Sequence, residues 1–251
     1  MPAVEAIDLS GLSAPAGGSQ RLKGHLVRPE GRGPWPGVVI AHEVLGVNDV
    51  MLRHAERLAG AGYLTLMPDL FTEGGARRCL IPTIRAAISG TGRAYQDLEA
   101  ARSCLLAQGD CTGAVGLIGF CMGGAFALMT AGRGDYDAVS ANYGLLPKDL
   151  DVLADACPVV ASFGGKDGTL KGAADKLSAT LERHGVVHDV KEYPQAGHAF
   201  LNDAEAGPRP LLPLFRVMNI GPDPDASADA WRRIESFFAT HLRAPRTAPR
   251  T

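Results

Sequence analysis

The sequence lacks four features that would each indicate a class of protein. No uninterrupted apolar run approaches the roughly 18 residues of a membrane helix, and no basic segment followed by an apolar run opens the chain. The formal net charge is -2, without the clustered Lys and Arg that phosphate binding needs. The five cysteines form no CxxC pair, and metal-ligand spacing is absent. These absences argue against a membrane protein, a nucleic-acid partner, a disulfide framework and a metal centre.

The composition is typical of one globular domain. Apolar residues make up 46% and charged residues 21% of the 251 positions. We expect a single domain over residues 1–241, acting as a monomer or homodimer, and a flexible tail over 242–251 that is rich in Arg and Pro. The odd number of cysteines suits reduced thiols, so a cytoplasmic location is expected. No cofactor is expected.

Short β-branched runs alternate with longer segments whose apolar residues recur every three or four positions. Several of the short runs, such as Val-Val-Ile, lack period-two alternation, as expected of parallel strands covered on both faces. The pattern predicts an α/β fold with a mostly parallel, twisted sheet of about seven or eight strands and helices on both faces. The predicted strands are 25–28, 37–41, 63–68, 114–119, 138–143, 158–164 and 187–193, and the predicted helices are 49–61, 94–108, 122–131, 173–184 and 226–241.

Residues 202–227 depart from this alternation. The segment carries five prolines beside several leucines and a phenylalanine, so it cannot be a regular helix throughout. It begins shortly after His198. Two interpretations stay open: a wall or lid of a site around His198, or a surface excursion that packs on the body.

Three short stretches carry the chemistry of this chain. They are GFCMGG (119–124), GGKD (164–167) and AGHAF (196–200). The first has the G-x-C-x-G pattern of a nucleophile elbow, a strained turn that lifts one side chain, Cys121, off the end of a strand. The order nucleophile, acid, base resembles that of the α/β-hydrolase fold, in which each residue follows a different strand. Together the stretches predict a hydrolase that uses Cys121, Asp167 and His198.

Each of these residues would have a purely structural interpretation if it stood alone. Asp167 would be a turn former in its Gly-rich turn, and the same caution applies to His198. Their joint order favours catalysis. A thiolate of Cys121 would be stabilised by the free N–H groups and the dipole at the start of a helix. His198 is the candidate base, and Asp167 would accept a hydrogen bond from its other ring nitrogen and fix its tautomer.

Attack on a carbonyl also needs N–H donors for the developing oxyanion. In this architecture one donor is the backbone N–H after the nucleophile, here Met122, and the other comes from the loop after an earlier strand. Val44 in the loop 42–48 is our candidate for the second donor. The neighbouring Glu43 would be either a carboxylate that shares a proton with Cys121 in a partly desolvated pocket or a solvated loop charge, and spacing alone does not decide between them.

The runs EVLGVN (43–48) and GFCMGG (119–124) closely resemble the dienelactone hydrolase family, and the similarity extends from about residue 23 to the last helix. The resemblance implies a carboxymethylenebutenolidase-like enzyme with Cys121, Asp167 and His198 as its triad. It also implies that Glu43 holds the resting thiol and helps to deprotonate it once substrate enters, which would protect the sulfur from oxidation between turnovers.

The chain also differs from the family pattern. Family enzymes that act on dienelactone are expected to hold the substrate carboxylate with two arginines, one after the strand that ends near Asp69 and one four residues after the catalytic histidine. The second position is Asn202 here. Candidates to take over these contacts are Arg77, Arg78, Arg85 and Arg93 and, from the proline-rich segment, Arg209 and Arg216. The natural substrate is therefore not implied by the resemblance.

A cysteine nucleophile limits the range of substrates that the protein can hydrolyse. A thiolate leaves a tetrahedral intermediate more readily than an alkoxide or an amide, so Cys121 needs a substrate with a good leaving group. We therefore predict hydrolysis of small-molecule lactones, enol lactones above all, or of activated carboxylic esters, through an acyl-thioester intermediate. An acyltransferase or thioesterase that uses the same triad, or a non-catalytic small-molecule binder with this fold, remains as an alternative.

Overall fold

The computed structural model describes residues 3–243, and its centre is an eight-stranded sheet in the order β1-β2-β4-β3-β5-β6-β7-β8. Strand β2 runs antiparallel to both β1 and β4, and the strands from β4 to β8 are parallel. The strands are β1 (Val4–Asp8), β2 (Lys23–Val27), β3 (Trp35–Ala41), β4 (Leu64–Pro68), β5 (Cys111–Phe120), β6 (Ala138–Asn142), β7 (Val159–Gly164) and β8 (His188–Tyr193). The predicted fold class is confirmed, and each of the seven predicted strands is present.

The register of the central strands brings their carboxyl ends to one edge of the sheet. Ala41 of β3 lies opposite Gly119 of β5, and Phe120 of β5 lies opposite Asn142 of β6. The side chains of β4, β6 and β7 are buried throughout, as expected for parallel strands with helices on both faces. The loops that follow β3, β5 and β6 therefore begin side by side.

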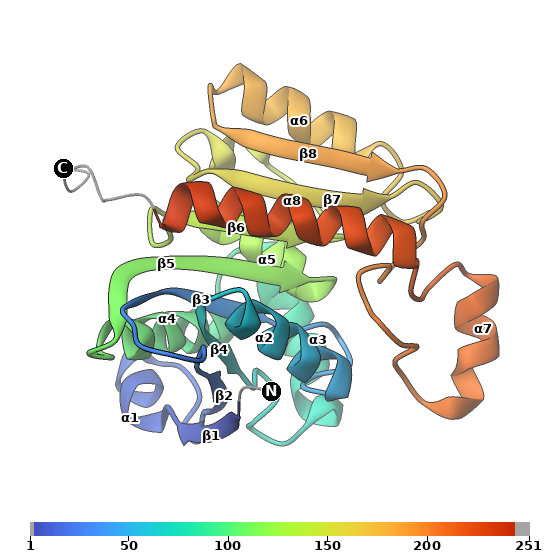
Figure 1. The fold of residues 1–251 in the computed structure, drawn as a ribbon. Coiled ribbons are helices and arrows are strands. Elements are labelled where there is room, and N and C mark those ends of the chain that lie inside the picture. Colours follow the sequence, from blue (N-terminus) through green and yellow to red (C-terminus); the bar gives the residue numbers. More distant parts are fainter. Residues whose placement is uncertain (1–2, 244–251) are drawn as a thin grey trace.

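Helices cover both faces of the sheet (Figure 1). Helix α8 crosses β5, β6 and β7 on the face that also carries α2, and α4 and α5 pack on the other face. The helices are α1 (Ser10–Ser13), α2 (Asp49–Gly60), α3 (Ala76–Ser89), α4 (Arg93–Leu106), α5 (Met122–Ala131), α6 (Ala173–Arg183), α7 (Leu212–Val217) and α8 (Pro224–Leu242), with three 3-10 turns, Ala14–Ala16, Leu150–Leu153 and Arg209–Leu211. In the described part of the chain, none of these helices combines the length and the apolar character that crossing a membrane requires.

Strand β1 and helix α3 were not predicted from the sequence. Three of the five β1 residues are exposed, so the sequence of this strand has no clear apolar pattern. The strand is formed by its pairing with β2. Helix α3 contains Pro82, which lacks an N–H and normally ends a helix. Pro82 itself is exposed, while Cys79, Thr83, Ala86 and Ala87 form a buried stripe along α3 that stabilises the helix.

The segment 202–227 is only partly helical, as its prolines require. It contains the 3-10 turn 209–211 and the short α7, which stands apart from the body of the molecule near the carboxyl ends of β7 and β8 (Figure 1). Helix α8 then starts at Pro224, two residues before the predicted start, because the side chain of Asp223 caps it by accepting a hydrogen bond from Ala226 N–H at 3.1 Å.

The end of α8 corrects the predicted domain boundary. Leu242, which we assigned to the tail, is the last residue of the helix and is only 1% exposed. Its side chain packs against Gly116 of β5, which has no Cβ to occupy that space. The rest of the predicted tail, from residue 244 onward, lies outside the described residues.

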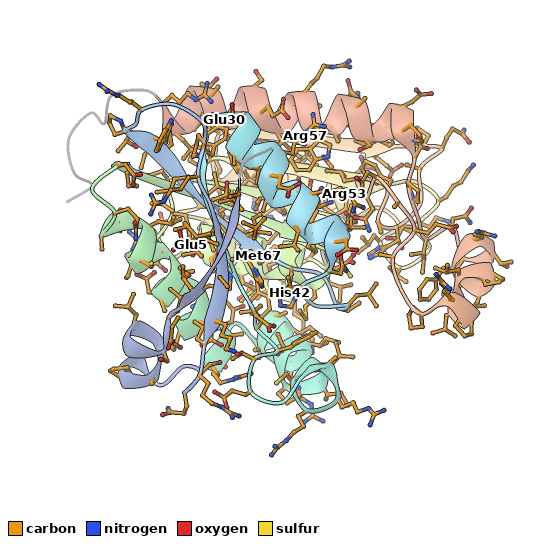
Figure 2. All side chains as sticks on the ribbon, turned by 60° about the horizontal axis from the view of Figure 1, so that its bottom comes forward. Glu5, Glu30, His42, Arg53, Arg57 and Met67 are labelled. Carbon is orange, nitrogen blue, oxygen red and sulfur yellow. The ribbon has the colours of Figure 1, made fainter. Side chains whose placement is uncertain are left out.

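Ion pairs on α2 hold two later parts of the chain. Arg53 and Arg57 project from this helix (Figure 2). The guanidinium of Arg53 donates to both carboxylate oxygens of Asp203, at 2.5 and 2.7 Å, and Arg57 donates to Glu235 of α8 at 2.8 Å. The start of the proline-rich segment and helix α8 are thus both attached to the helix that follows β3.

Candidate active site

Cys121 lies between the end of β5 and the start of α5 in a strained backbone conformation. Its φ of 54° and ψ of -113° are rare for a residue with a side chain. Methyl groups at Gly119 and Gly123 would overlap the carbonyl oxygens of Gly123 and Ala41, respectively. A methyl group at Gly124 would lie 2.7 Å from a carbonyl oxygen of β6. The turn is therefore packed main chain against main chain, which explains each glycine of the motif.

His198 and Asp167 meet beside this turn. His198 Nδ1–H donates to Asp167 Oδ2 at 2.5 Å, and the other oxygen of Asp167 accepts from the backbone N–H and the hydroxyl of Thr169, at 3.0 and 2.6 Å. Asp167 is buried. With both carboxylate oxygens engaged, Asp167 holds the imidazole in one tautomer, with Nε2 left for Cys121. Cys121 and His198 line the same two cavities.

Burial, hydrogen bonds and neighbouring charges shift the pKa values of His198 and Asp167. Burial alone lowers the pKa of His198, but the hydrogen bond to Asp167, a hydrogen bond with Cys121 and the negative charges of both raise it to about 10. Burial alone raises the pKa of Asp167, but the hydrogen bonds from His198 and Thr169 outweigh it and hold the pKa below its usual value. The arrangement therefore favours a protonated His198 imidazole beside the Asp167 carboxylate.

The backbone of His198 is fixed by the end of the proline-rich segment. His198 N–H donates to the carbonyl of Asn219 at 2.8 Å, and Gly221 N–H donates to the carbonyl of His198 at 2.9 Å. A side chain at Gly197 would overlap the Asn219 carbonyl. The segment that departs from the α/β alternation thus supports the histidine loop directly.

Glu43 is buried beside the site, with 3% of its surface exposed, so it is not a solvated loop charge. Asn48 Nδ2 donates to Glu43 Oε1 at 3.0 Å, and Asn202 Nδ2 donates to Glu43 Oε2 at 3.5 Å. Asn48 also caps α2 by accepting from Met51 N–H at 3.0 Å. Burial raises the pKa of Glu43 despite these hydrogen bonds and the charge of His198, which lower it.

The two candidate oxyanion donors, Met122 and Val44, line the larger cavity together with Cys121. Met122 is the first residue of α5, and the N–H of a first helical residue has no partner within its own helix. Val44 follows Glu43 and borders both cavities. The loop after β3 and the start of α5 therefore bring the two predicted donors to the same place.

His42 positions this loop, and we did not single it out from the sequence. It is fully buried in the interior (Figure 2). Leu70 N–H donates to its Nε2 at 3.1 Å, so Nδ1 carries the proton and donates to the Glu43 carbonyl at 2.8 Å. That carbonyl also accepts from Gly46 N–H at 3.0 Å. The Glu43–Val44 peptide has its N–H on the opposite edge from its carbonyl, so these bonds also orient the Val44 N–H.

Tyr143 was also missed, because nothing in the sequence distinguishes it from a core aromatic. It follows β6 with a φ of 41°, and its ring centroid lies 5.1 Å from that of His198. Its hydroxyl contacts Asn202 Oδ1 at 3.4 Å, and His54 Nε2 contacts the same oxygen at 3.4 Å. Asn202 thus connects Glu43 to two buried rings.

Two cavities open on Cys121 and His198. One, of about 210 Å³, is bounded by Glu43, Asn202 and residues 205–221 of the proline-rich segment. The other, of about 400 Å³, lies between α3 and α5. The proline-rich segment therefore forms a wall of the smaller cavity.

The predicted substrate-binding residues are placed unequally. Asn202 is buried and lines the smaller cavity. Arg77, Arg78 and Arg85 are exposed on α3, and none of them lines either cavity. Of the other arginines considered, Arg93 donates to Ser19 Oγ at 2.6 Å, and Arg216 pairs with Glu205. Within residues 3–243, no group of three or more His, Cys, Asp or Glu side chains is arranged to hold a metal ion.

Known proteins resemble this chain in sequence and in structure. Carboxymethylenebutenolidase from Pseudomonas putida is 30% identical over 195 residues, which cover 73% of this chain and 83% of that protein. A dienelactone hydrolase-like promiscuous phosphotriesterase from metagenomic libraries is 27% identical, with a TM-score of 0.77 over 96% of this chain and 99% of that one. Dienelactone hydrolase from Anabaena variabilis, 21% identical, shares the fold with a TM-score of 0.63 over 96% and 99% of the two chains.

The family match covers most of the chain. Residues 22–242 match the dienelactone hydrolase family, from the residue before β2 to the end of α8. This range contains the elbow, the acid and the histidine. With its eight-stranded α/β-hydrolase sheet, the chain belongs to the dienelactone hydrolase family.

Proposed function

We propose that this protein is a cysteine-dependent hydrolase of lactones, enol lactones in particular, or of activated carboxylic esters. The observation that carries the proposal is the Asp167–His198 hydrogen bond of 2.5 Å next to Cys121, which stands on a strained turn at the junction of two cavities. The Pseudomonas putida relative, a carboxymethylenebutenolidase, supports the lactone substrate class.

Catalysis begins with the thiolate of Cys121. His198 Nε2 takes the thiol proton, and the raised pKa of His198 supports an imidazolium beside the anionic sulfur. The Sγ atom attacks the substrate carbonyl carbon and forms a C–S bond. The carbonyl oxygen becomes an oxyanion, which accepts hydrogen bonds from the backbone N–H groups of Met122 and Val44.

Collapse of the tetrahedral intermediate breaks the bond to the leaving oxygen. In an enol lactone this oxygen departs as a delocalised enolate, and His198 returns its proton to it. Water then attacks the acyl thioester, with His198 accepting a proton from it, and the C–S bond breaks to release the carboxylic acid and restore Cys121. An unactivated amide would expel sulfur instead, so peptidase activity is not expected.

Glu43 controls the resting state in this proposal. Its carboxyl group is buried, borders the same cavity as Cys121 and has a raised pKa, so it holds a proton more readily than an exposed glutamate does. A neutral, protonated thiol between turnovers is less prone to oxidation than a thiolate. The resemblance to the family supports this role.

The test is turnover of p-nitrophenyl acetate together with mass spectrometry. Cys121→Ala is expected to lower kcat by at least about a thousandfold, since the nucleophile is lost. His198→Ala is expected to retain a covalent acyl adduct on Cys121, because the thioester is then hydrolysed slowly. Cys104→Ala on α4 is the matched thiol control and should leave turnover unchanged. Full activity of Cys121→Ala would refute the mechanism.

A further inference from the structure

The larger cavity offers a binding site for one part of the substrate. Its apolar wall is formed by Ile84, Ala87 and Ile88 of α3, Ala125 of α5, and Leu145 and Leu170 from the loops after β6 and β7. Leu145 and Ile88 are exposed at its mouth. None of these apolar residues was among the candidate substrate contacts, which were arginines and Asn202.

The residues that line the larger cavity disfavour a negatively charged substrate group. Among the residues that line the cavity, the polar groups are those of Cys121, Tyr143, Thr169 and His198. The Thr169 hydroxyl donates to Asp167, the Tyr143 hydroxyl contacts Asn202, and His198 Nδ1–H donates to Asp167. A substrate carboxylate placed against the apolar wall of this cavity would lose its hydration without gaining a Lys or Arg partner, because neither residue type lines the cavity.

The smaller cavity is no better suited to an anion. Two carboxylate residues, Glu43 and Glu205, line it, and no Lys or Arg of the described chain does. Arg216, the nearest candidate by sequence, donates to both oxygens of Glu205, at 2.5 and 2.7 Å. A substrate carboxylate would therefore find no Lys or Arg partner among the residues that line this cavity.

The oxyanion donors indicate which substrate group occupies which cavity. Met122 and Val44 both border the larger cavity, whereas only Val44 borders the smaller one. The reacting carbonyl is therefore expected at the edge of the larger cavity, where the carbon chain attached to it has room to extend. The residues that follow His198, namely Ala199 and Asn202, border the smaller cavity, which suits the leaving group that His198 protonates.

Building on the proposed function, we infer that the apolar cavity between α3 and α5 binds an uncharged aliphatic acyl group, so that the preferred substrates are neutral esters or lactones with an alkyl chain rather than carboxylate-bearing ones. The volume of about 400 Å³ is within the range of small-molecule pockets. Burying each methylene of such a chain is expected to raise kcat/KM by about fourfold.

The experiment compares kcat/KM for p-nitrophenyl acetate, butanoate and hexanoate with that for mono-p-nitrophenyl adipate, which has the six-carbon chain of the hexanoate but ends in a carboxylate. We expect kcat/KM to rise from acetate to hexanoate and to fall at least about tenfold from hexanoate to adipate. A flat chain-length series, or equal turnover of the two six-carbon esters, would overturn the inference.

A charge placed at the mouth of the larger cavity tests whether the acyl group binds there. Ile88 is 39% exposed and lines the cavity, so Ile88→Arg should fold and place a guanidinium at its mouth. We expect this variant to raise the adipate-to-hexanoate ratio of kcat/KM by about two- to fivefold. Ile81→Arg, on the same helix at 61% exposure and away from both cavities, is the matched control and should leave the ratio unchanged. Equal effects of the two variants would place the acyl group elsewhere.

Failure of this inference is distinguishable from failure of the proposed function. If acetate hydrolysis depends on Cys121 but chain length and charge have no effect, the assignment of the cavity is wrong and the mechanism stands. If acetate hydrolysis survives Cys121→Ala, the mechanism itself is wrong, and the assignment of the acyl group, which rests on it, falls with it.

Discussion

Replacement of His42 by Phe tests how the loop after β3 is held. The side chain is fully buried and packs edge to face on Phe71 at 4.9 Å between centroids, so a second aromatic ring of similar size fits the space. The change removes the acceptor of Leu70 N–H and the donor to the Glu43 carbonyl. The perturbation is therefore one of hydrogen bonding more than of volume.

The expected loss of stability follows from these two bonds. An orphaned buried N–H at Leu70 costs about 1–3 kcal/mol, and loss of the bond to Glu43 costs about 1 kcal/mol more, because Gly46 still satisfies that carbonyl. The free energy of unfolding should fall by about 2–4 kcal/mol, which lowers Tm by roughly 4–16 °C for a chain of this size.

The expected loss of activity follows from the peptide that joins Glu43 to Val44. Removal of a whole oxyanion donor costs about 100- to 1000-fold in kcat. The Gly46 bond still restrains the peptide in His42→Phe, so we expect a fall of about 10- to 100-fold in kcat with little change in KM. Steady-state kinetics on p-nitrophenyl acetate and thermal unfolding measure the two effects separately.

Two further variants separate positioning from simple destabilisation. His42→Gln keeps one donor and one acceptor, and it should recover most of the lost kcat. Thr65→Val removes the buried hydroxyl that donates to the Tyr63 carbonyl at 3.0 Å in β4, so it should lower Tm without lowering kcat. The reasoning is refuted if His42→Phe loses stability as expected but retains the kcat of the unmodified protein.

Three other predictions concern the pH response, the elbow and the core. The pKa of His198 is raised from 6.5 to about 10 on folding, and that of Asp167 is lowered from 3.8. The stability that this pair contributes is therefore complete between about pH 3.8 and 6.5 and is lost progressively above and below that window. When Tm is measured over a pH series that spans this window, it should vary less for Asp167→Asn than for the unmodified protein. Gly123→Ala forces a methyl group against the carbonyl oxygen of Ala41 and should cost about 3 kcal/mol or more in urea unfolding, and a fully active, stable variant would contradict the packing described for the elbow. Asp97→Leu removes a fully buried carboxylate that accepts three hydrogen bonds from Ser13 and Ser19, so the free energy of unfolding is expected to fall by about 3–5 kcal/mol, and an unchanged urea midpoint would contradict a stabilising role of Asp97.

The parts of the fold that the sequence predicts are those whose stability is local or comes from continuous burial. Strands β3, β5, β6 and β7 are apolar runs because both of their faces are covered. Strand β1 is held by its antiparallel partner instead, so its composition carries little signal. Helix α3 tolerates Pro82 because its stripe of buried residues packs against the body of the protein, and only the tertiary structure reveals that contact.

In the candidate site, too, features set by local sequence were predictable and features set by tertiary contacts were not. The spacing of small residues around Cys121 and the chain order of Asp167 and His198 were enough to predict which residues meet. The role of His42 depends on Leu70, a residue in the loop after another strand, and pairing across that distance leaves no mark in the sequence. The apolar cavity likewise depends on where α3 lies, so its lining could not be predicted.

The support of the nucleophile consists of main chain rather than side chains. Gly119, Gly123 and Gly124 each contact a backbone carbonyl oxygen, so the elbow rests on its own turn and on β3 and β6 with no side chain in between. Substitutions that repack the surrounding core shift side chains, but they do not change this packing of main chain on main chain. Laboratory evolution toward new substrates could therefore rebuild the walls of either cavity while the sulfur atom stays where it is.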